Sequence, residues 1–166
     1  MEISIFQQFY SDNQENVNSA KTTVLKAMEN PGYIQTLFQF LQSPESQSNP
    51  AIERMIQITI LDMIRRFWND FSEPQAEVRY WDPQQQNEIA KFLLELLFST
   101  PFEKRGNLIE CFRIIILGSF PANIDFAYQL IQLFDSHTES FQDITTILYM
   151  STFWAQACGK REYPEE

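Results

Sequence analysis

Glycine and proline are the residues that most restrict what this chain can fold into. Only four glycines occur in 166 residues, which is too few for the many tight turns of a β-rich domain of this size. The eight prolines lie between segments of periodic apolar residues and never in the middle of one. Proline at such positions opens a helix or interrupts a loop. The distribution of these two residues therefore predicts an all-α protein.

Capping residues mark where the predicted helices begin. Three pairs fit the capping box, in which an N-cap side chain and a side chain three residues later bind each other's backbone N–H: Asp12 with Glu15, Asp82 with Gln85, and Thr100 with Glu103. Asn49 before Pro50 is an N-cap followed by a first-turn proline. A short apolar helix over 3–9 should precede the others. The remaining helices are expected to start near residues 13, 31, 50, 83, 101, 121 and 138, with loops over 43–49 and 69–81.

The predicted helices alternate as first and second members of pairs. First members begin about 37, then about 51, then about 37 residues apart, and a period near 40 with two helices per unit is typical of HEAT-type helical solenoids. Several helices, notably 50–68 and 101–118, are apolar on more than one side, as expected for helices between neighbouring repeats. An irregular helical bundle is the alternative that this spacing leaves open.

Charge and composition exclude several classes of function. The 12 Lys and Arg residues against 22 Asp and Glu give a net charge of −10 at pH 7, which disfavours nucleic acid and suits a basic protein partner. No secretory signal and no apolar run long enough to cross a membrane is present. One histidine and two cysteines form no zinc motif, and phosphate-binding glycine loops and nucleophile elbows are absent. We expect no catalytic residues, no cofactor and no metal, and hence no enzyme.

Four segments, in order along the chain, carry a family resemblance. The longest is PFEKRGNLIEC at 101–111, continued by Ile115, Ile116 and the Phe120-Pro121 pair. The others are ILDMIRRFW at 60–68, the NPGY turn at 30–33 and YPEE at 163–166. Together they resemble the N-terminal region of the importin-β superfamily of transport receptors (the karyopherins-β), and most of all the large importins of the importin seven and eight type.

The resemblance implies a fold and a function. It implies a HEAT-like solenoid of about three and a half helix pairs wound into a right-handed superhelix, with residues 1–166 forming one importin-β N-terminal-like domain, as a fragment or a truncated form. It also implies a module that binds the small GTPase Ran in its GTP form, supports nucleocytoplasmic protein transport, and works in the cytoplasm, in the nucleus and at the pores of the nuclear envelope. Leu61 and Asp62 replace a Lys-Asn pair of the family pattern, and Ser119 replaces an Asp. These departures favour the alternative of a HEAT-like interaction scaffold that does not bind Ran.

The candidate contact surface follows from helical spacing together with the resemblance, since family members contact Ran largely through second helices. On these helices, the polar residues opposite the apolar side are spaced by three or four positions and so share a face. They form three stripes: Gln35, Gln39 and Gln42; Glu88, Lys91 and Glu95; and Asp125, Gln129 and Gln132. An ordinary solvated helix face is the alternative interpretation.

The last predicted helix, about 138–158, carries more apolar residues than one neighbouring helix pair can cover. They are Phe141, Ile144, Ile147, Leu148, Tyr149, Phe153 and Trp154. Burial stabilises by roughly 25 cal/mol per Å² of apolar surface, so an uncovered helix face favours association. We therefore expect the chain to self-associate through its C-terminal helix, with Phe153 and Trp154 as the residues to test.

Overall fold

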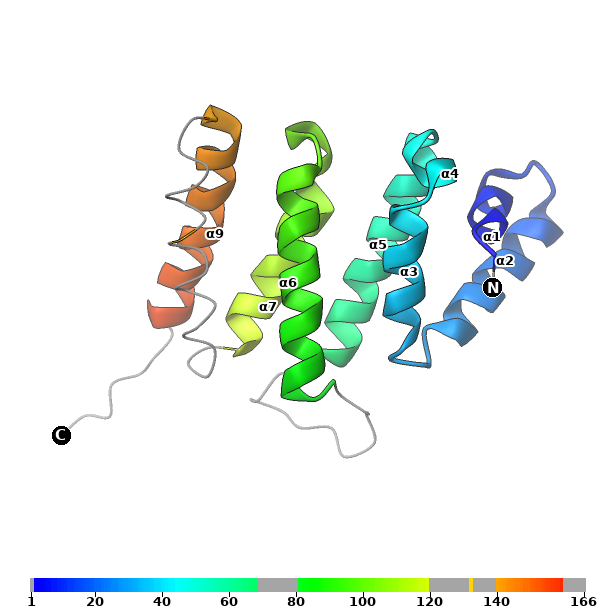
Figure 1. Cartoon of the computed structure of the whole chain (residues 1–166). Helices are drawn as coiled ribbons and strands as arrows, with labels where there is room; N and C mark the ends of the chain where they lie inside the picture. Colours follow the sequence, from blue (N-terminus) through cyan, green and yellow to red (C-terminus); the bar gives the residue numbers. More distant parts are fainter. Residues whose placement is uncertain (1, 69–80, 120–131, 133–139, 160–166) are drawn as a thin grey trace. The chain divides into compact units, whose positions relative to one another are not determined.

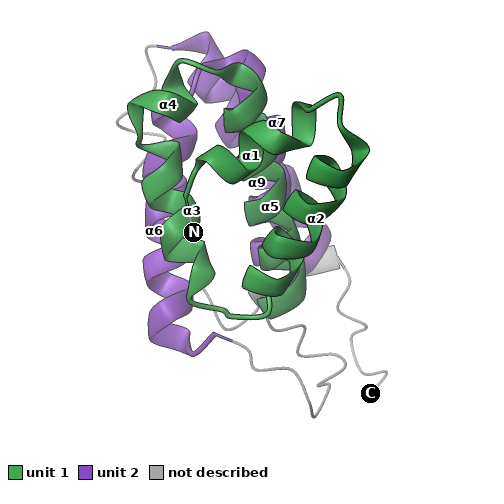
Figure 2. Ribbon diagram, turned by 90° about the vertical axis from the view of Figure 1, so that its right-hand side faces the viewer, with its two compact units in different colours: residues 1–67 green, residues 68–166 purple. Residues whose placement is uncertain are grey.

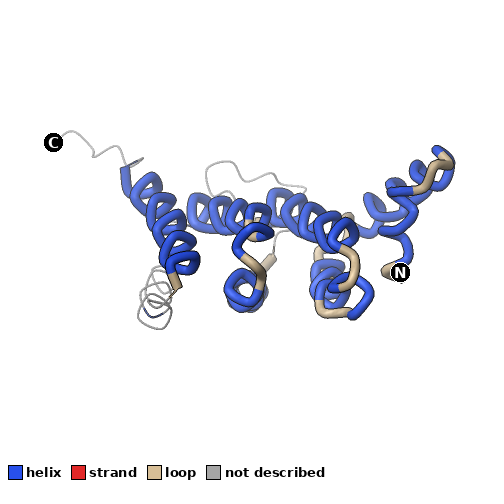
Figure 3. Tube along the Cα trace, turned by 90° about the horizontal axis from the view of Figure 1, so that it is seen from above, coloured by secondary structure: helices blue, strands red, loops and turns tan. Residues whose placement is uncertain are grey.

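A computed structural model describes residues 2–68, 81–119, 132 and 140–159 (Figure 1). Every regular element in these ranges is a helix, and no strand occurs among them (Figure 3). This confirms the all-α prediction. The chain divides into two compact units, residues 1–67 and residues 68–166, which Figure 2 shows in different colours. Each unit is described by itself.

The first unit is built around one long helix, α5 (Pro50–Phe67). Before it come α1 (Ser4–Gln7), the 3-10 turn η1 (Gln8–Tyr10), α2 (Gln14–Ala27), α3 (Tyr33–Leu41) and α4 (Pro44–Gln47). Helices α1, α3 and α4 all pack against α5. The core consists of buried apolar side chains at helical spacing, including Phe6, Ala20, Val24, Ile34, Leu37, Ile52, Ile56, Ile60, Met63 and Ile64.

The second unit contains α6 (Pro83–Ser99), the 3-10 turn η2 (Phe102–Lys104), α7 (Gly106–Ser119) and α9 (Phe141–Gly159). Helix α7 packs against both α6 and α9. Its core includes Ile89, Leu93, Leu97, Leu108, Phe112, Ile115, Ile116, Ile147 and Met150. The indole rings of Trp68 and Trp81 are also buried and meet edge to face, with centroids 6.4 Å apart.

Two of the predicted caps form as expected. The Asp82 carboxylate accepts a hydrogen bond from the Gln85 backbone N–H at 2.8 Å, and the Gln85 side chain accepts one from the Asp82 N–H at 3.2 Å. This is a complete capping box at the start of α6. The Asn49 side chain likewise accepts from the backbone N–H of Ala51 at 3.1 Å, immediately before α5.

The cap of α2 is Asn13, and the prediction of Asp12 was wrong by one residue. Asn13 Oδ1 accepts from the Glu15 backbone N–H at 2.8 Å. The Asn13 backbone N–H itself donates to Ser11 Oγ at 3.1 Å. Asp and Asn are comparable N-caps, so composition alone does not choose between neighbouring positions. The backbone of Asn13 is extended, as is typical of an N-cap, and this identifies Asn13 as the cap of α2.

The third predicted capping box does not form, and α7 does not start at Pro101. The Thr100 hydroxyl donates to the Leu96 carbonyl at 2.7 Å, so Thr100 closes the end of α6 instead of opening α7. Residues 102–104 then form η2, and α7 begins at Gly106. Glu103 is exposed. The box fails because Thr100 is the C-cap of α6 and the residues after it form a 3-10 turn, so Thr100 does not stand at the N-cap of α7.

The predicted loop at 43–49 is partly helical. Ser43 is the N-cap of α4, accepting from the Ser46 backbone N–H, and Pro44 is the first helical residue. Ser46 is completely buried and donates to the carbonyl of Leu41 at 3.0 Å, which satisfies a carbonyl left open at the end of α3. Residues 43–49 are mostly polar, and for that reason a loop was predicted there.

Several predictions fall outside the described residues. They are most of the loop over 69–81, the helix starting near residue 121, and the YPEE segment at 163–166. The last helix, α9, begins at Phe141, and the Ser140 hydroxyl accepts from the Asp143 backbone N–H at 3.3 Å. The helix ends at Gly159, close to the predicted end near 158.

Candidate protein-binding surface

The α3 stripe, defined as Gln35, Gln39 and Gln42, is exposed over its whole length. It lies opposite Ile34, Leu37, Phe38 and Leu41, which are buried. Since these apolar residues hold one side of α3 against the core of the first unit, the three glutamines must point outward. Each primary amide offers donors and acceptors to a partner, and the stripe itself has no charge.

Tyr33 fixes the first turn of α3. Its side chain is buried, and burial raises the pKa of its phenol to about 12 because the phenolate is poorly solvated there. Tyr33 therefore stays neutral throughout the physiological range. Its burial helps to set the rotation of α3 and hence the direction in which the α3 stripe points.

The α6 stripe, defined as Glu88, Lys91 and Glu95, is also exposed. It stands opposite the buried Ile89, Leu93 and Leu97. Gln84 Nε2 donates to Glu88 Oε1 at 3.2 Å, one turn earlier on the same helix. The stripe is thus a row of two carboxylates and one ammonium group. Such a row can form ion pairs with a partner that presents mainly basic residues.

The third predicted stripe is described only at Gln132, which is helical and exposed. Asp125 and Gln129 lie outside the described residues. Five of the nine predicted contact residues thus fall on α3 and α6, and a sixth, Gln42, is the C-cap residue of α3. Within each helix the three residues share a face, as their spacing predicts.

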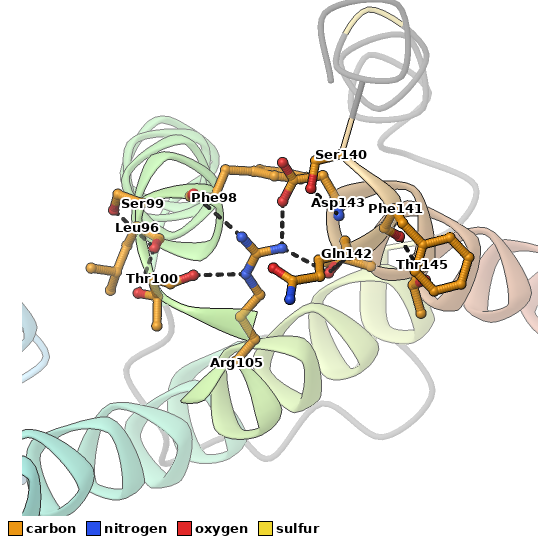
Figure 4. A network of polar contacts seen from close by, with 11 residues as sticks. Leu96, Phe98, Ser99, Thr100, Arg105, Ser140, Phe141, Gln142, Asp143 and Thr145 are labelled. Atoms are coloured by element: carbon orange, nitrogen blue, oxygen red, sulfur yellow. Dashed lines mark hydrogen bonds and ion pairs between the residues drawn. The ribbon is translucent and has the colours of Figure 1, made fainter. Parts of the chain in front are cut away.

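The polar cluster around Arg105 was not predicted, because Lys104-Arg105 stands in the sequence only as a short basic pair. The Arg105 side chain is buried in the second unit, between the end of α6 and the first turn of α9 (Figure 4). Its Nη1 donates to Asp143 Oδ1 at 2.6 Å and to Thr146 Oγ1 at 3.0 Å. Its Nε donates to the Thr100 carbonyl at 2.8 Å. No sequence pattern links positions 105 and 143, which are 38 residues apart.

Arg105 also contacts two aromatic rings, since its guanidinium lies 5.5 Å from the centroid of Phe98 and 6.0 Å from that of Phe102. By contrast, Arg113 pairs with Glu110 on the same turn of α7, at 2.7 Å, with both side chains partly exposed. The side-chain hydrogen bond to Glu110 raises the pKa of Arg113. The Arg105 cluster is therefore a structural link within the second unit, and it leaves no charge free for a ligand.

The C-terminal helix exposes apolar side chains, as expected, although not those chosen for a test. Phe141 is 82% exposed, Leu148 56% and Tyr149 54%. Phe153 and Trp154 are half-buried. These two side chains are thus neither fully outward nor fully inward, and the effect of replacing them with polar residues stays a prediction.

The described residues show few features of a metal-binding or reactive site. No group of three or more His, Cys, Asp or Glu side chains that could hold a metal occurs in the part of the chain that the structure describes. Cys111 is completely buried in α7. None of the helices in the described ranges is both long and apolar enough to cross a membrane.

Comparison with known proteins found no relative of this chain. No family model, no curated protein and no solved structure matches the chain.

Proposed function

We propose that this chain is the N-terminal module of a nuclear transport receptor of the importin-β type, and that it binds Ran in its GTP form. In this proposal the helices belong to a HEAT-like right-handed solenoid. The observation that carries the proposal is that the α3 stripe and the α6 stripe, chosen from the resemblance, are both exposed polar rows opposite buried apolar sides. The module acts in the cytoplasm and the nucleus and has no catalytic activity of its own.

Electrostatics supports a basic partner surface. The chain has a net charge of −10, which attracts a positively charged protein over several ångströms before contact. The α6 stripe supplies two carboxylates for ion pairs, while the amides of the α3 stripe supply hydrogen bonds without adding charge. Binding through these rows should weaken with added salt, because exposed ion pairs are screened within about 8–10 Å at moderate ionic strength. Basic cargo proteins are a second partner class by the same argument.

The test compares binding of the chain to Ran carrying a non-hydrolysable GTP analogue and to Ran carrying GDP, by calorimetry at two salt concentrations. We expect binding in the micromolar range, preference for the GTP form and a decline with salt. The variant Glu88→Lys with Glu95→Lys should weaken binding at least about tenfold. A matched control, Glu29→Lys with Glu103→Lys, makes the same change in net charge at exposed positions outside the stripes and should bind nearly as well as the unchanged chain.

The alternative is a HEAT-like interaction scaffold that does not bind Ran, and one observation favours it. At the position of the family's Lys-Asn pair, Leu61 is buried and the Asp62 carboxylate lies 3.3 Å from the guanidinium of Arg65. A buried leucine offers a partner no polar contact there. Equal binding of both nucleotide forms, or no binding at micromolar protein, would contradict the Ran proposal and leave the scaffold.

A further inference from the structure

One face of α9 points away from the core of the second unit. Phe141, Thr145, Leu148, Thr152 and Ala155 recur at alternating intervals of four and three, which places them on one side of the helix. We call these five residues the α9 face. The opposite side carries Thr146, Met150 and Ala157, which are all buried. On the α9 face, only Thr145 is partly covered, and the other four residues are exposed.

The polar groups of the α9 face can be removed from water at little cost. Thr145 Oγ1 donates to the Phe141 carbonyl at 2.8 Å, and Thr152 Oγ1 donates to the Tyr149 carbonyl at 2.7 Å. Both hydroxyl protons are thus already used within α9, and the threonines can present their methyl groups to a partner. Burying a hydroxyl is costly only when it loses its hydrogen bond. The α9 face therefore behaves as an apolar surface.

The α9 face also carries no charge. Asp143 is the only charged residue between 141 and 159, and it binds Arg105 with its side chain only 16% exposed. Two copies of a chain with a net charge of −10 repel each other wherever their acidic surfaces meet. The α9 face is a surface at which two copies can meet without bringing carboxylates together. A strongly charged partner would find no complementary group on it.

We propose that the α9 face binds the same face of a second copy, with the two helices antiparallel and Leu148 at the two-fold axis. In this arrangement Phe141 of one copy packs on Ala155 of the other, and Thr145 packs on Thr152. A large side chain thus meets a small one at each end, which allows the two helices to approach closely. A two-fold axis makes both ends equivalent, so the same complementarity is used twice.

The dimer is weak. The α9 face from Phe141 to Ala155 is about 21 Å long at a rise of about 1.5 Å per residue. Five residues a side is far fewer than the roughly 20–30 residues of a standard interface, so the contact is small. We expect dissociation in the micromolar range or weaker, since buried area alone does not set affinity. Added salt strengthens the dimer, because it screens the repulsion between the acidic copies and leaves the apolar contact unchanged.

The first test is sedimentation equilibrium of the full chain from low to high micromolar concentration. The unchanged chain is expected to show a monomer–dimer equilibrium. Leu148→Glu places two carboxylates together at the axis and should raise the dissociation constant by more than about tenfold. Leu25→Glu is the matched control, since Leu25 is a similarly exposed leucine on α2, at 60%. A chain that stays monomeric at every concentration, or equal effects of the two variants, would overturn the proposal.

The second test determines the orientation by disulfide cross-linking, in a Cys158→Ser background that keeps the buried Cys111. Phe141→Cys and Ala155→Cys chains are oxidised separately and as a mixture. The antiparallel arrangement predicts covalent dimers only in the mixture. Dimers from each variant alone would show a parallel arrangement and overturn the proposal, as would an absence of covalent dimers in all three samples. The variant Glu88→Lys with Glu95→Lys changes the α6 stripe and leaves the α9 face intact, so it should still dimerise. Loss of Ran binding and loss of dimerisation can therefore be told apart.

Discussion

Arg105 and Asp143 join the turn that precedes α7 to the first turn of α9, with Arg105 Nη1 2.6 Å from Asp143 Oδ1. The pair is almost completely covered, with the Arg105 side chain 6% exposed. Arg105 also donates to the carbonyl of Thr100 just after α6, so one guanidinium connects three helices of the second unit (Figure 4). This places a buried, fully engaged charge at a point where the sequence shows only a basic pair.

Replacing Arg105 with methionine should destabilise the chain strongly. The change leaves the Asp143 carboxylate buried without its counter-charge, and loss of one partner of a buried ion pair costs about 3–5 kcal/mol. Arg113→Met is the matched control, because its partner Glu110 is 31% exposed and such pairs contribute about 0–1 kcal/mol. Urea unfolding followed by circular dichroism measures both. Similar losses for the two variants would show that the Arg105 pair is no more than a surface pair.

Asn13 should be the residue that stabilises the start of α2. Asn13→Ala removes the side chain that accepts from the Glu15 N–H, and loss of an N-cap costs about 1 kcal/mol. Asp12→Ala is expected to change the free energy of unfolding by less than about 0.5 kcal/mol, since surface substitutions outside caps have effects of that size. Thermal unfolding of the two variants gives the comparison. A larger loss for Asp12→Ala would restore the cap predicted from the sequence.

The two predicted capping boxes in the second unit should respond differently to mutation. Gln85→Ala removes the side chain that accepts from the Asp82 N–H, so it should cost several tenths of a kcal/mol to about 1 kcal/mol. Glu103→Ala should be close to neutral, because the Thr100 hydroxyl donates to Leu96 and no box forms there. Chemical denaturation at neutral pH measures both variants, and a cost for Glu103→Ala equal to that of Gln85→Ala would contradict this account.

Tyr33 should make the chain less stable at high pH. Its pKa is raised from 10.0 to about 12 by burial, so the unfolded chain loses the phenolic proton first as the pH rises. Its contribution to stability is complete below pH 10 and declines between about pH 10 and 12, by up to about 2–3 kcal/mol. Tyr33→Phe should show a smaller decline over the same range. Urea unfolding at pH 9, 10 and 11 compares the two chains, and parallel curves would exclude this role.

The features that could be predicted from the sequence are those decided within one or two helical turns. The all-α class follows from the placement of glycine and proline. The starts of α5 and α6 follow from Asn49-Pro50 and from Asp82 with Gln85, where the donor and the acceptor lie within three residues. The same holds for the exposure of the α3 stripe and the α6 stripe, because three- and four-residue spacing fixes which side chains share a face. The partner proposed for these stripes came from the resemblance, and it stays a prediction.

Tertiary structure decided what depends on residues far apart in the chain. Thr100 with Glu103 has the same local pattern as Asp82 with Gln85, yet the Thr100 hydroxyl closes α6 and the Thr100 carbonyl binds Arg105. Apolar residues lie on nearly every side of α9, so its sequence did not reveal that Phe141 and Leu148 face outward while Ile147 and Met150 are buried. Local hydrogen bonds determine where a helix begins, but burial depends on the neighbouring helix that covers it, and only the fold brings that helix into place.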